Sequence, residues 1–168
     1  MLEVITYPNP LLRQISKPVE VFDEELHTLL DGMYEVMLVK NGVGISAIQV
    51  AKPIRALLIC IPDEEGNQHK EDLLEVINPE IIEKDGEIIF SEGCLSVPEF
   101  YEDIKRYSRV KVVYQDRFGK KHEITAQDYL AVAFQHEIDH LNGVLFVDKL
   151  SIVKRKKFEK GLKQKHKF

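Results

Sequence analysis

The sequence contains little cysteine and no long apolar run, and both features restrict the class of protein. Only two cysteines, Cys60 and Cys94, occur among 168 residues, which is too few for a disulfide framework and fits a reducing compartment. The longest apolar runs have six residues, such as ALLICI at 56–61, whereas a membrane-spanning helix needs about 20. The N-terminal segment also lacks a basic stretch followed by an apolar one, the pattern of a secretory signal. These absences predict a cytoplasmic protein that does not span a membrane.

The chain also lacks repeats and low-complexity linkers, and its length suits one compact domain. Charge is distributed unevenly along it. Residues 154–168 (KRKKFEKGLKQKHKF) contain eight of the 23 Lys+Arg and one of the 28 Asp+Glu, which leaves a formal charge of −12 on the preceding residues. We therefore expect one domain at 1–153 and a basic helical tail at 154–168. On charge alone the tail is equally a solvated helix or a contact with a phosphate backbone.

Hydrophobic periodicity predicts an α+β architecture. Leucine and methionine recur at helical spacing over about 23–40, before the helix stop Asn41-Gly42. Thr125 and Asp128 resemble a capping box, which predicts a central helix over about 125–142, and a C-terminal helix is expected from about 151. Strands without regular intervening helices favour antiparallel β-sheets around that central helix. The strand-like segments, bounded by turn signals, are 54–61, 73–77, 87–90, 109–115 and 121–125.

The segment QHEIDHLNG at 135–143 carries the spacing of a metal-binding helix. His136 and His140 are four residues apart, so both imidazoles lie on one helix face, and Glu137 projects from nearly the same side. Two histidines with a neighbouring glutamate are typical of sites in which a metal and a carboxylate act together on water. The pattern predicts a divalent metal site on the central helix.

A catalytic metal site of this kind needs a third protein ligand. Downstream, the donors Asp148, Glu159 and His166 have no favourable context, since the last two lie in the charged tail. Upstream, Cys94 follows a strand-like segment, and taken alone it fits a buried structural thiol. A thiolate with two imidazoles is nevertheless a sound donor set that leaves one position for water, so Cys94 is the predicted third ligand. Cys60 lies in an apolar strand and is predicted to be structural.

Three segments resemble the signature motifs of bacterial peptide deformylases in order and in spacing. They are GVGISAIQ at 42–49, EGCLS at 92–96 and QHEIDHLNG at 135–143. The resemblance extends from the N-terminal ITYPNPLLRQISKPV to the end of the second long helix. It implies a hydrolase that removes the formyl group from the N-terminal formylmethionine of nascent polypeptides. It also implies one divalent ion, which in this family is ferrous iron (Fe2+) and which zinc, nickel or cobalt (Zn2+, Ni2+ or Co2+) can replace.

The resemblance also implies a role for each matching residue. Glu137 would be the general base and acid, acting on water whose pKa the metal lowers from about 15.7 towards about 7. The side-chain amide of Gln49 and the backbone N–H of Leu95 would donate to the formyl oxygen. The implied metal ligands are Cys94, His136 and His140.

The resemblance implies seven substrate contacts, of which Val43, Tyr129, Val132 and Ala133 match positions that surround the methionine side chain in the family. Two positions depart from the family, where alanine is usual in place of Ser46 and several members carry arginine in place of Tyr101. Glu92 with Arg106 is interpreted as ordinary surface charge, and a supporting ion pair is the alternative. Gly44 is expected to let the backbone pass close to the substrate. The substrate contacts are Val43, Gly44, Glu92, Tyr101, Tyr129, Val132 and Ala133.

Two other classes of protein remain open from the residues. A zinc-dependent peptidase would use the same helix with a long substrate cleft. A non-enzymatic module with a structural metal would need a fourth protein ligand and would not use Glu137. In bacterial deformylases a C-terminal helical extension is implicated in docking on the ribosome, so the resemblance implies a ribosome contact through the tail. No pattern in the sequence indicates an oligomeric state.

Overall fold

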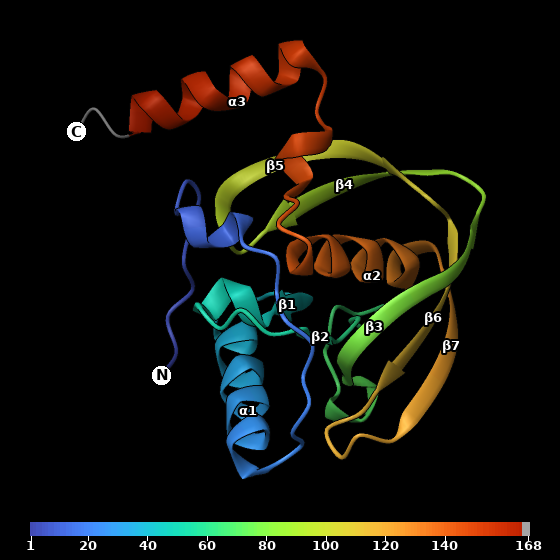
Figure 1. The fold of residues 1–168 in the computed structure, drawn as a ribbon. Helices are drawn as coiled ribbons and strands as arrows, with labels where there is room; N and C mark the ends of the chain where they lie inside the picture. The colour runs from blue at the N-terminus through green and yellow to red at the C-terminus, as the bar shows by residue number, and fades with distance from the viewer. Residues whose placement is uncertain (166–168) are drawn as a thin grey trace.

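The computed structural model describes residues 1–165 and has an α+β fold with two antiparallel sheets (Figure 1). The larger sheet has the strand order β1-β2-β3-β6-β7, and β4 pairs only with β5. The strands are β1 (Gly44–Ser46), β2 (Ala56–Ile59), β3 (Leu74–Asp85), β4 (Ile88–Cys94), β5 (Val97–Arg106), β6 (Arg109–Gln115) and β7 (Lys121–Gln127). The helices are α1 (Glu24–Val39), α2 (Asp128–Leu141) and α3 (Ile152–Lys165), with short 3-10 turns η1 (Pro10–Arg13), η2 (Ala47–Val50), η3 (Lys70–Asp72) and η4 (Phe146–Lys149).

Helix α2 lies between the two sheets, with the β4–β5 hairpin on one side and the larger sheet on the other (Figure 1). Its apolar face, including Phe134 and Ile138, packs against buried strand residues such as Leu57 and Val112. Burial of such side chains stabilises the fold by about 1.5–3 kcal/mol each. The opposite face of the helix is therefore free to carry polar side chains toward β4.

Helix α1 confirms the helix expected over 23–40. The side chain of Asp23 accepts a hydrogen bond from the Leu26 amide at 3.1 Å, which caps the first turn. Leu30, Met33 and Met37 are fully buried against the larger sheet. The helix ends at Val39, two residues before Asn41. It therefore positions the segment 42–44 that follows it.

The central helix begins at Asp128, so the start expected at about 125 is wrong. Thr125 pairs with Lys111 in the β6–β7 ladder, and its backbone groups are therefore committed to the sheet rather than to a helix cap. The predicted stop after the histidines is confirmed, since Asn142 caps the helix and Gly143 follows with φ +76°. A Cβ at Gly143 would lie 2.4 Å from the Arg13 carbonyl oxygen. Only glycine therefore fits at 143, where the chain that leaves α2 passes close to the backbone of η1.

The expected strands all occur, but the sequence pattern missed two others. β6 has the predicted bounds, while β3 continues eight residues beyond the predicted end at Ile77. Strands β1 and β5 were not predicted. β5 lies in a two-stranded sheet and most of its side chains are not buried, so it lacks the apolar alternation that marks a core strand.

Helix α3 starts at Ile152, close to the expected position, and its first half is docked on the domain. Phe158 is buried against Tyr7 and Phe100, with ring centroids 5.4 and 4.6 Å apart. Arg155 donates to Asp148 at 3.2 Å. In the second half of the helix, Leu162 is partly buried against the same apolar cluster, while the charged side chains with a described burial are exposed. Figure 1 shows α3 at the edge of the fold, with the C-terminus at its far end. His166 and the last two residues of the expected tail lie outside the described residues. Within 1–165, no helix combines the length and the apolarity that crossing a membrane requires.

Candidate metal centre and active site

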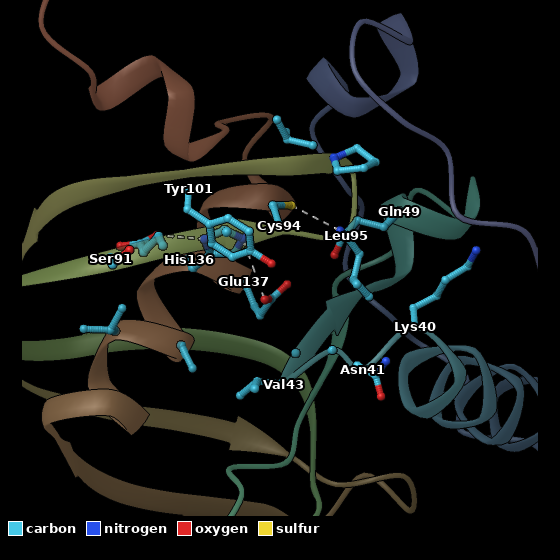
Figure 2. A pocket seen from close by; sticks show the side chains of 18 of the residues that line it. Lys40, Asn41, Val43, Gln49, Ser91, Cys94, Leu95, Tyr101, His136 and Glu137 are labelled. Carbon is cyan, nitrogen blue, oxygen red and sulfur yellow. Dashed lines mark hydrogen bonds and ion pairs between the residues drawn. The ribbon is translucent and has the colours of Figure 1, made fainter. Parts of the chain in front are cut away.

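The three predicted ligands converge on one point beside α2. His136 and His140 project from successive turns of the helix. Cys94 ends strand β4 and lies beside His136 in Figure 2. The Nε2 atoms of the two histidines are 3.2 Å apart, and Cys94 Sγ lies 3.4 Å from His140 Nε2. All three donor atoms lie within 4.8 Å of one another. The expected combination of one β-strand thiol and two helix imidazoles is therefore assembled.

The spacing of these donors fits a single metal ion. Zinc-ligand distances of about 2.0–2.1 Å for nitrogen and about 2.3 Å for sulfur place tetrahedral N···N pairs about 3.3 Å and N···S pairs about 3.6 Å apart. The observed separations of 3.2 and 3.4 Å agree with both values. Burial and the neighbouring His136 lower the pKa of His140 well below its ordinary value, which favours the neutral imidazole that binds metals. The residues therefore fit a divalent ion with one position left for water.

Glu137 is a buried carboxylic acid beside this cluster. Its Oε2 lies 3.9 Å from His136 Nε2, and its Oε1 has no hydrogen-bond partner among the described residues. Burial, together with the charge of Glu92, raises the pKa of Glu137 to about 7, although His136 opposes the shift. A Cβ at Gly44 would lie 2.6 Å from Glu137 Oε2, so glycine is needed there for close approach. The group can therefore both accept and return a proton near neutral pH.

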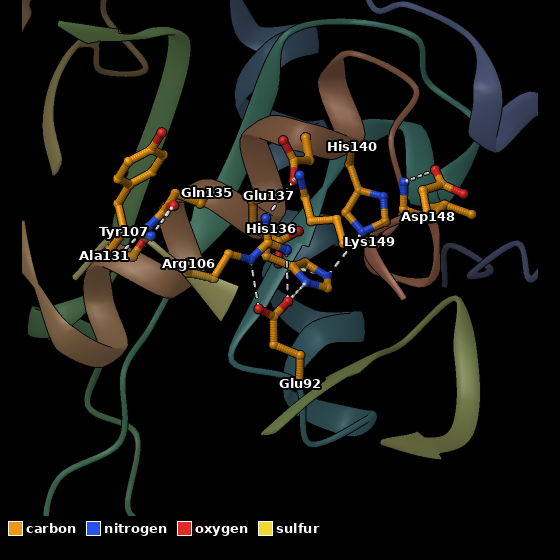
Figure 3. A network of polar contacts seen from close by, with 12 residues as sticks. Glu92, Arg106, Tyr107, Ala131, Gln135, His136, Glu137, His140, Asp148 and Lys149 are labelled. Atoms are coloured by element: carbon orange, nitrogen blue, oxygen red, sulfur yellow. Dashed lines mark hydrogen bonds and ion pairs between the residues drawn. The ribbon is translucent and has the colours of Figure 1, made fainter. Parts of the chain in front are cut away.

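A buried ion network supports His136, and the interpretation of Glu92 and Arg106 as surface charge is wrong. Glu92 and Arg106 are 4% and 6% exposed. Arg106 donates to both Glu92 oxygens at 2.7 and 2.8 Å and to Asp139 at 2.6 Å (Figure 3). Burial raises the pKa of Glu92, but hydrogen bonds from Arg106 and His136 outweigh it, and the net shift is downward. Glu92 Oε1 lies 2.8 Å from His136 Nδ1, which fixes the ring orientation and leaves Nε2 for the metal.

Gln49 reaches the same cluster from η2. Its Oε1 accepts hydrogen bonds from the Ser46 amide at 2.9 Å and the Ser46 hydroxyl at 3.1 Å. Its Nε2 donates to Ser96 at 3.0 Å and lies 3.5 Å from Cys94 Sγ. The serine that replaces the usual alanine of the family therefore fixes the Gln49 amide with an additional hydrogen bond. The sequence analysis noted the departure at Ser46 but did not predict this contact.

The cluster opens into a cavity of about 600 Å³ between α2, the β4–β5 hairpin and the segment after α1. All seven expected substrate contacts line it, and Gln49, Leu95, His136 and Glu137 do so as well. Tyr101 is 71% exposed and lies in front of the metal cluster (Figure 2). Phe90 also lines the cavity and packs on Tyr129 with centroids 4.8 Å apart. It was missed because it lies outside the EGCLS motif at 92–96 of the same strand, although it ended a predicted strand-like segment.

This combination defines a metal-dependent hydrolase, because the ligands leave one coordination position open beside a carboxylate that can exchange a proton with water. Residues 1–156 match the family described as polypeptide deformylase. The peptide deformylase of Wolinella succinogenes is 67% identical over 165 residues, 98% of this chain and 97% of the relative. The chain therefore belongs to the polypeptide deformylase family, whose reaction is hydrolytic removal of the N-terminal formyl group from nascent polypeptides.

Solved structures agree with this assignment. The peptide deformylase from Legionella pneumophila superposes with a TM-score of 0.88 at 42% identity and covers 100% of this chain and 99% of its own. The peptide deformylase from Ehrlichia chaffeensis in complex with actinonin gives a TM-score of 0.91 at 36% identity, with the same coverage. The shared fold includes the two sheets around α2, and it confirms the predicted α+β class.

Proposed function

We propose that this chain hydrolyses the formyl group of N-terminal formylmethionine through the cluster on α2. The observation that carries the proposal is the convergence of the three donor atoms within 4.8 Å of one another beside buried Glu137. In this assignment Glu137 is the general base and then the general acid. The ligands of one divalent ion are Cys94, His136 and His140.

Each protein group has a defined task in the reaction. An ion held by Cys94, His136 and His140 would supply Lewis acidity, which lowers the pKa of water from about 15.7 towards about 7. Glu137 takes a proton from the attacking water and returns it to the departing amine, a contribution of about 10²- to 10⁴-fold. The Gln49 amide and the Leu95 backbone N–H stabilise the charge that develops on the formyl oxygen. The fixed position of Gln49 between Ser46 and Ser96 supports this role.

The cavity wall supports selection of a methionine side chain. Val132 and Ala133 are buried on α2, and Val43, Tyr129 and Gly44 complete an apolar recess beside the cluster. A flexible thioether packs well in such a recess. Glu92 and Tyr101 also line the cavity, Glu92 through its contact with His136 and Tyr101 at the mouth. We infer a preference for formyl-Met over formyl-Ala, because each methylene contributes about 1–3 kcal/mol to discrimination.

We propose ferrous iron as the ion, with zinc, nickel or cobalt able to substitute. One thiolate and two imidazoles accept all four metals, and zinc binds more tightly than ferrous iron in the general order of affinities. The occupant is therefore determined by supply and by exposure to oxygen. Metal analysis of protein purified without oxygen should find about one iron per chain. One zinc per chain under those conditions would contradict the choice of iron.

We further propose that residues 1–153 contain the catalytic machinery, whereas 154–168 bind a phosphate-rich surface on the ribosome. Lys156, Lys157, Lys160 and Lys163 are exposed along α3, and clustered lysines bind phosphate backbones by releasing counterions. A substrate that emerges during translation would place the enzyme in the cytoplasm. Replacing these four lysines with alanine should abolish co-sedimentation with ribosomes at low salt and leave hydrolysis of a short peptide unchanged. Equal co-sedimentation of both proteins would contradict the tail assignment.

Release of formate tests the proposed reaction against the peptidase alternative. The purified protein should release formate from a formyl-Met tripeptide and leave the internal peptide bonds of the same tripeptide intact. Mass spectrometry distinguishes the two products, because loss of the formyl group and cleavage of the backbone give different masses. Backbone cleavage without formate release would favour the peptidase.

A further inference from the structure

An exposed loop between β2 and η3 is closed on itself by Asp63. The Asp63 carboxylate accepts hydrogen bonds from the amides of Glu65 and Asn67, both at 2.9 Å. Its second oxygen lies 2.7 Å from His69 Nε2, and Gly66 at φ +85° completes the turn. These contacts fix the backbone on both sides of Gln68. The loop is therefore a preformed support for that side chain.

Gln68 joins this loop to the wall of the active-site cavity. Its Nε2 donates to the carbonyl oxygens of Gly42 and Cys60, both at 2.9 Å. Both partners are acceptors only, so the NH₂ end of the amide must face them. Gly42 and Cys60 are buried, whereas Gln68 is half-buried between the exposed residues 63–67 and exposed His69. One side chain thus provides donors for two buried carbonyl groups of neighbouring segments.

The two hydrogen bonds of Gln68, here called the Gln68 bridge, lie beside the end of the β1–β2 ladder. The last paired residues on this side are Gly44 and Ile59, and the Cys60 amide adds one more bond to the Val43 carbonyl at 2.8 Å. β1 is an edge strand, so the segment before it has a sheet neighbour on one side only. Through its hydrogen bond to the Gly42 carbonyl, Gln68 extends the hydrogen bonding of this segment by one residue beyond Val43. Gly42, Val43 and Gly44 all line the cavity.

We propose that Gln68 is a positioning residue, which holds the Gly42–Gly44 wall against β2 so that the wall is preformed for the formylated peptide. This rests on the proposed function, because it takes Val43 and Gly44 as substrate contacts. The ligands and Glu137 are carried by β4 and α2, and Gln68 makes no hydrogen bond to them. Loss of the bridge should therefore weaken substrate binding and leave the chemical step nearly unchanged.

The first test is steady-state kinetics of Gln68→Met with a formyl-Met tripeptide. Methionine keeps the length of the side chain but has no donor. We expect KM to rise about tenfold, with kcat within about twofold of the original, the signature of lost uniform binding. Asn67→Ala is the matched control, since it removes an amide from the same loop, and only backbone atoms of Asn67 take part in the loop bonds described above. It should leave both constants unchanged.

The second test uses pH to restore a donor. A glutamate at 68 faces two carbonyl oxygens, which disfavour its ionised form and raise its pKa. In Gln68→Glu, the excess of KM over the original protein should be greatest at pH 8 and should shrink toward pH 5.5, as the carboxyl becomes a donor. Gln68→Met has no titrating group, so its KM excess should not change over this range. A purely structural loop residue would not produce this difference.

Two outcomes would overturn the bridge. The first is an unchanged KM in Gln68→Met, measured well below its melting temperature. The second is an equal loss of kcat in Gln68→Met and Asn67→Ala, which would indicate general damage to the loop. Failure of the proposed function is distinguishable, because the original protein would then release no formate from the tripeptide.

Discussion

Helices α2 and α3 have the same length, 14 residues each, but their polar side chains occupy opposite environments. On α2, His136, Glu137 and His140 are at most 7% exposed, and the two imidazoles lie against Cys94 and Glu92. On α3, most charged residues are exposed, and Phe158 is the buried residue among those whose side chains are described. Buried polar groups need specific partners, whereas exposed charges keep their water. Substitutions on α2 and around it should therefore change the chemistry. Substitutions on α3 should instead change how this helix is attached to the domain.

The largest expected effect lies beside α2, at the thiol ligand. Cys94→Ala should lose the bound metal and with it nearly all formate release, because two imidazoles alone do not complete the site. The matched control is Cys60→Ala. Cys60 lies buried directly after β2, and its thiol donates a hydrogen bond to the His69 carbonyl at 3.3 Å. That control should retain one metal per chain by elemental analysis. Tight binding of one metal by Cys94→Ala would show that the ligand set is wrong.

The buried ion network of Glu92 and Arg106 should contribute more to the free energy of unfolding than a similar network on the surface. Arg106→Ala leaves buried Glu92 without its arginine, with only His136 as a partner, which should lower the free energy of unfolding by about 3–5 kcal/mol. Arg109→Ala breaks pairs with Glu83 and Asp85, whose side chains are 52% and 62% exposed, and should cost about 0–1 kcal/mol. Urea denaturation measures both. Equal losses would remove the distinction between buried and exposed charge on which the comparison depends.

A smaller effect is expected from the apolar contact that docks α3. Phe158→Ala removes the ring packed on Tyr7 and Phe100 and should lower the free energy of unfolding by about 1–3 kcal/mol. Hydrogen exchange of α3 amides should accelerate, while those of α2 keep their protection. Val153→Ala, at an exposed position of the same helix, should change neither. Faster exchange throughout α2 would mean that the two helices unfold together.

The same contrast explains what could be predicted from the sequence. The histidine spacing and the helix stop are local patterns, and the structure confirms the helix, its end and the convergence of Cys94 with the imidazoles. The start of α2 was wrong because Thr125 is held in the sheet by β6, a contact between distant segments that no local cap pattern reports. Tertiary pairing overrode the local preference.

Other features could not be predicted because they depend on partners far apart in the sequence. Glu92 and Arg106 are 14 residues apart, and they come together only when β4 pairs with β5, which also brings Glu92 to His136 on α2. Charged residues on a hairpin are usually exposed, so surface charge was the reasonable interpretation. The contact of Ser46 with Gln49 is local, three residues apart, but it was not predicted either, since a serine in a glycine-rich segment has many possible partners.

The division between metal binding and proton transfer on α2 is tested most directly by measuring metal content and turnover together in Glu137→Gln. The substitution keeps the size of the side chain and the ligands but removes the group that exchanges protons. One equivalent of metal should remain, while kcat for a formyl-Met tripeptide falls by about 10²- to 10⁴-fold. Full turnover with one metal bound, or loss of the metal itself, would contradict the role given to Glu137.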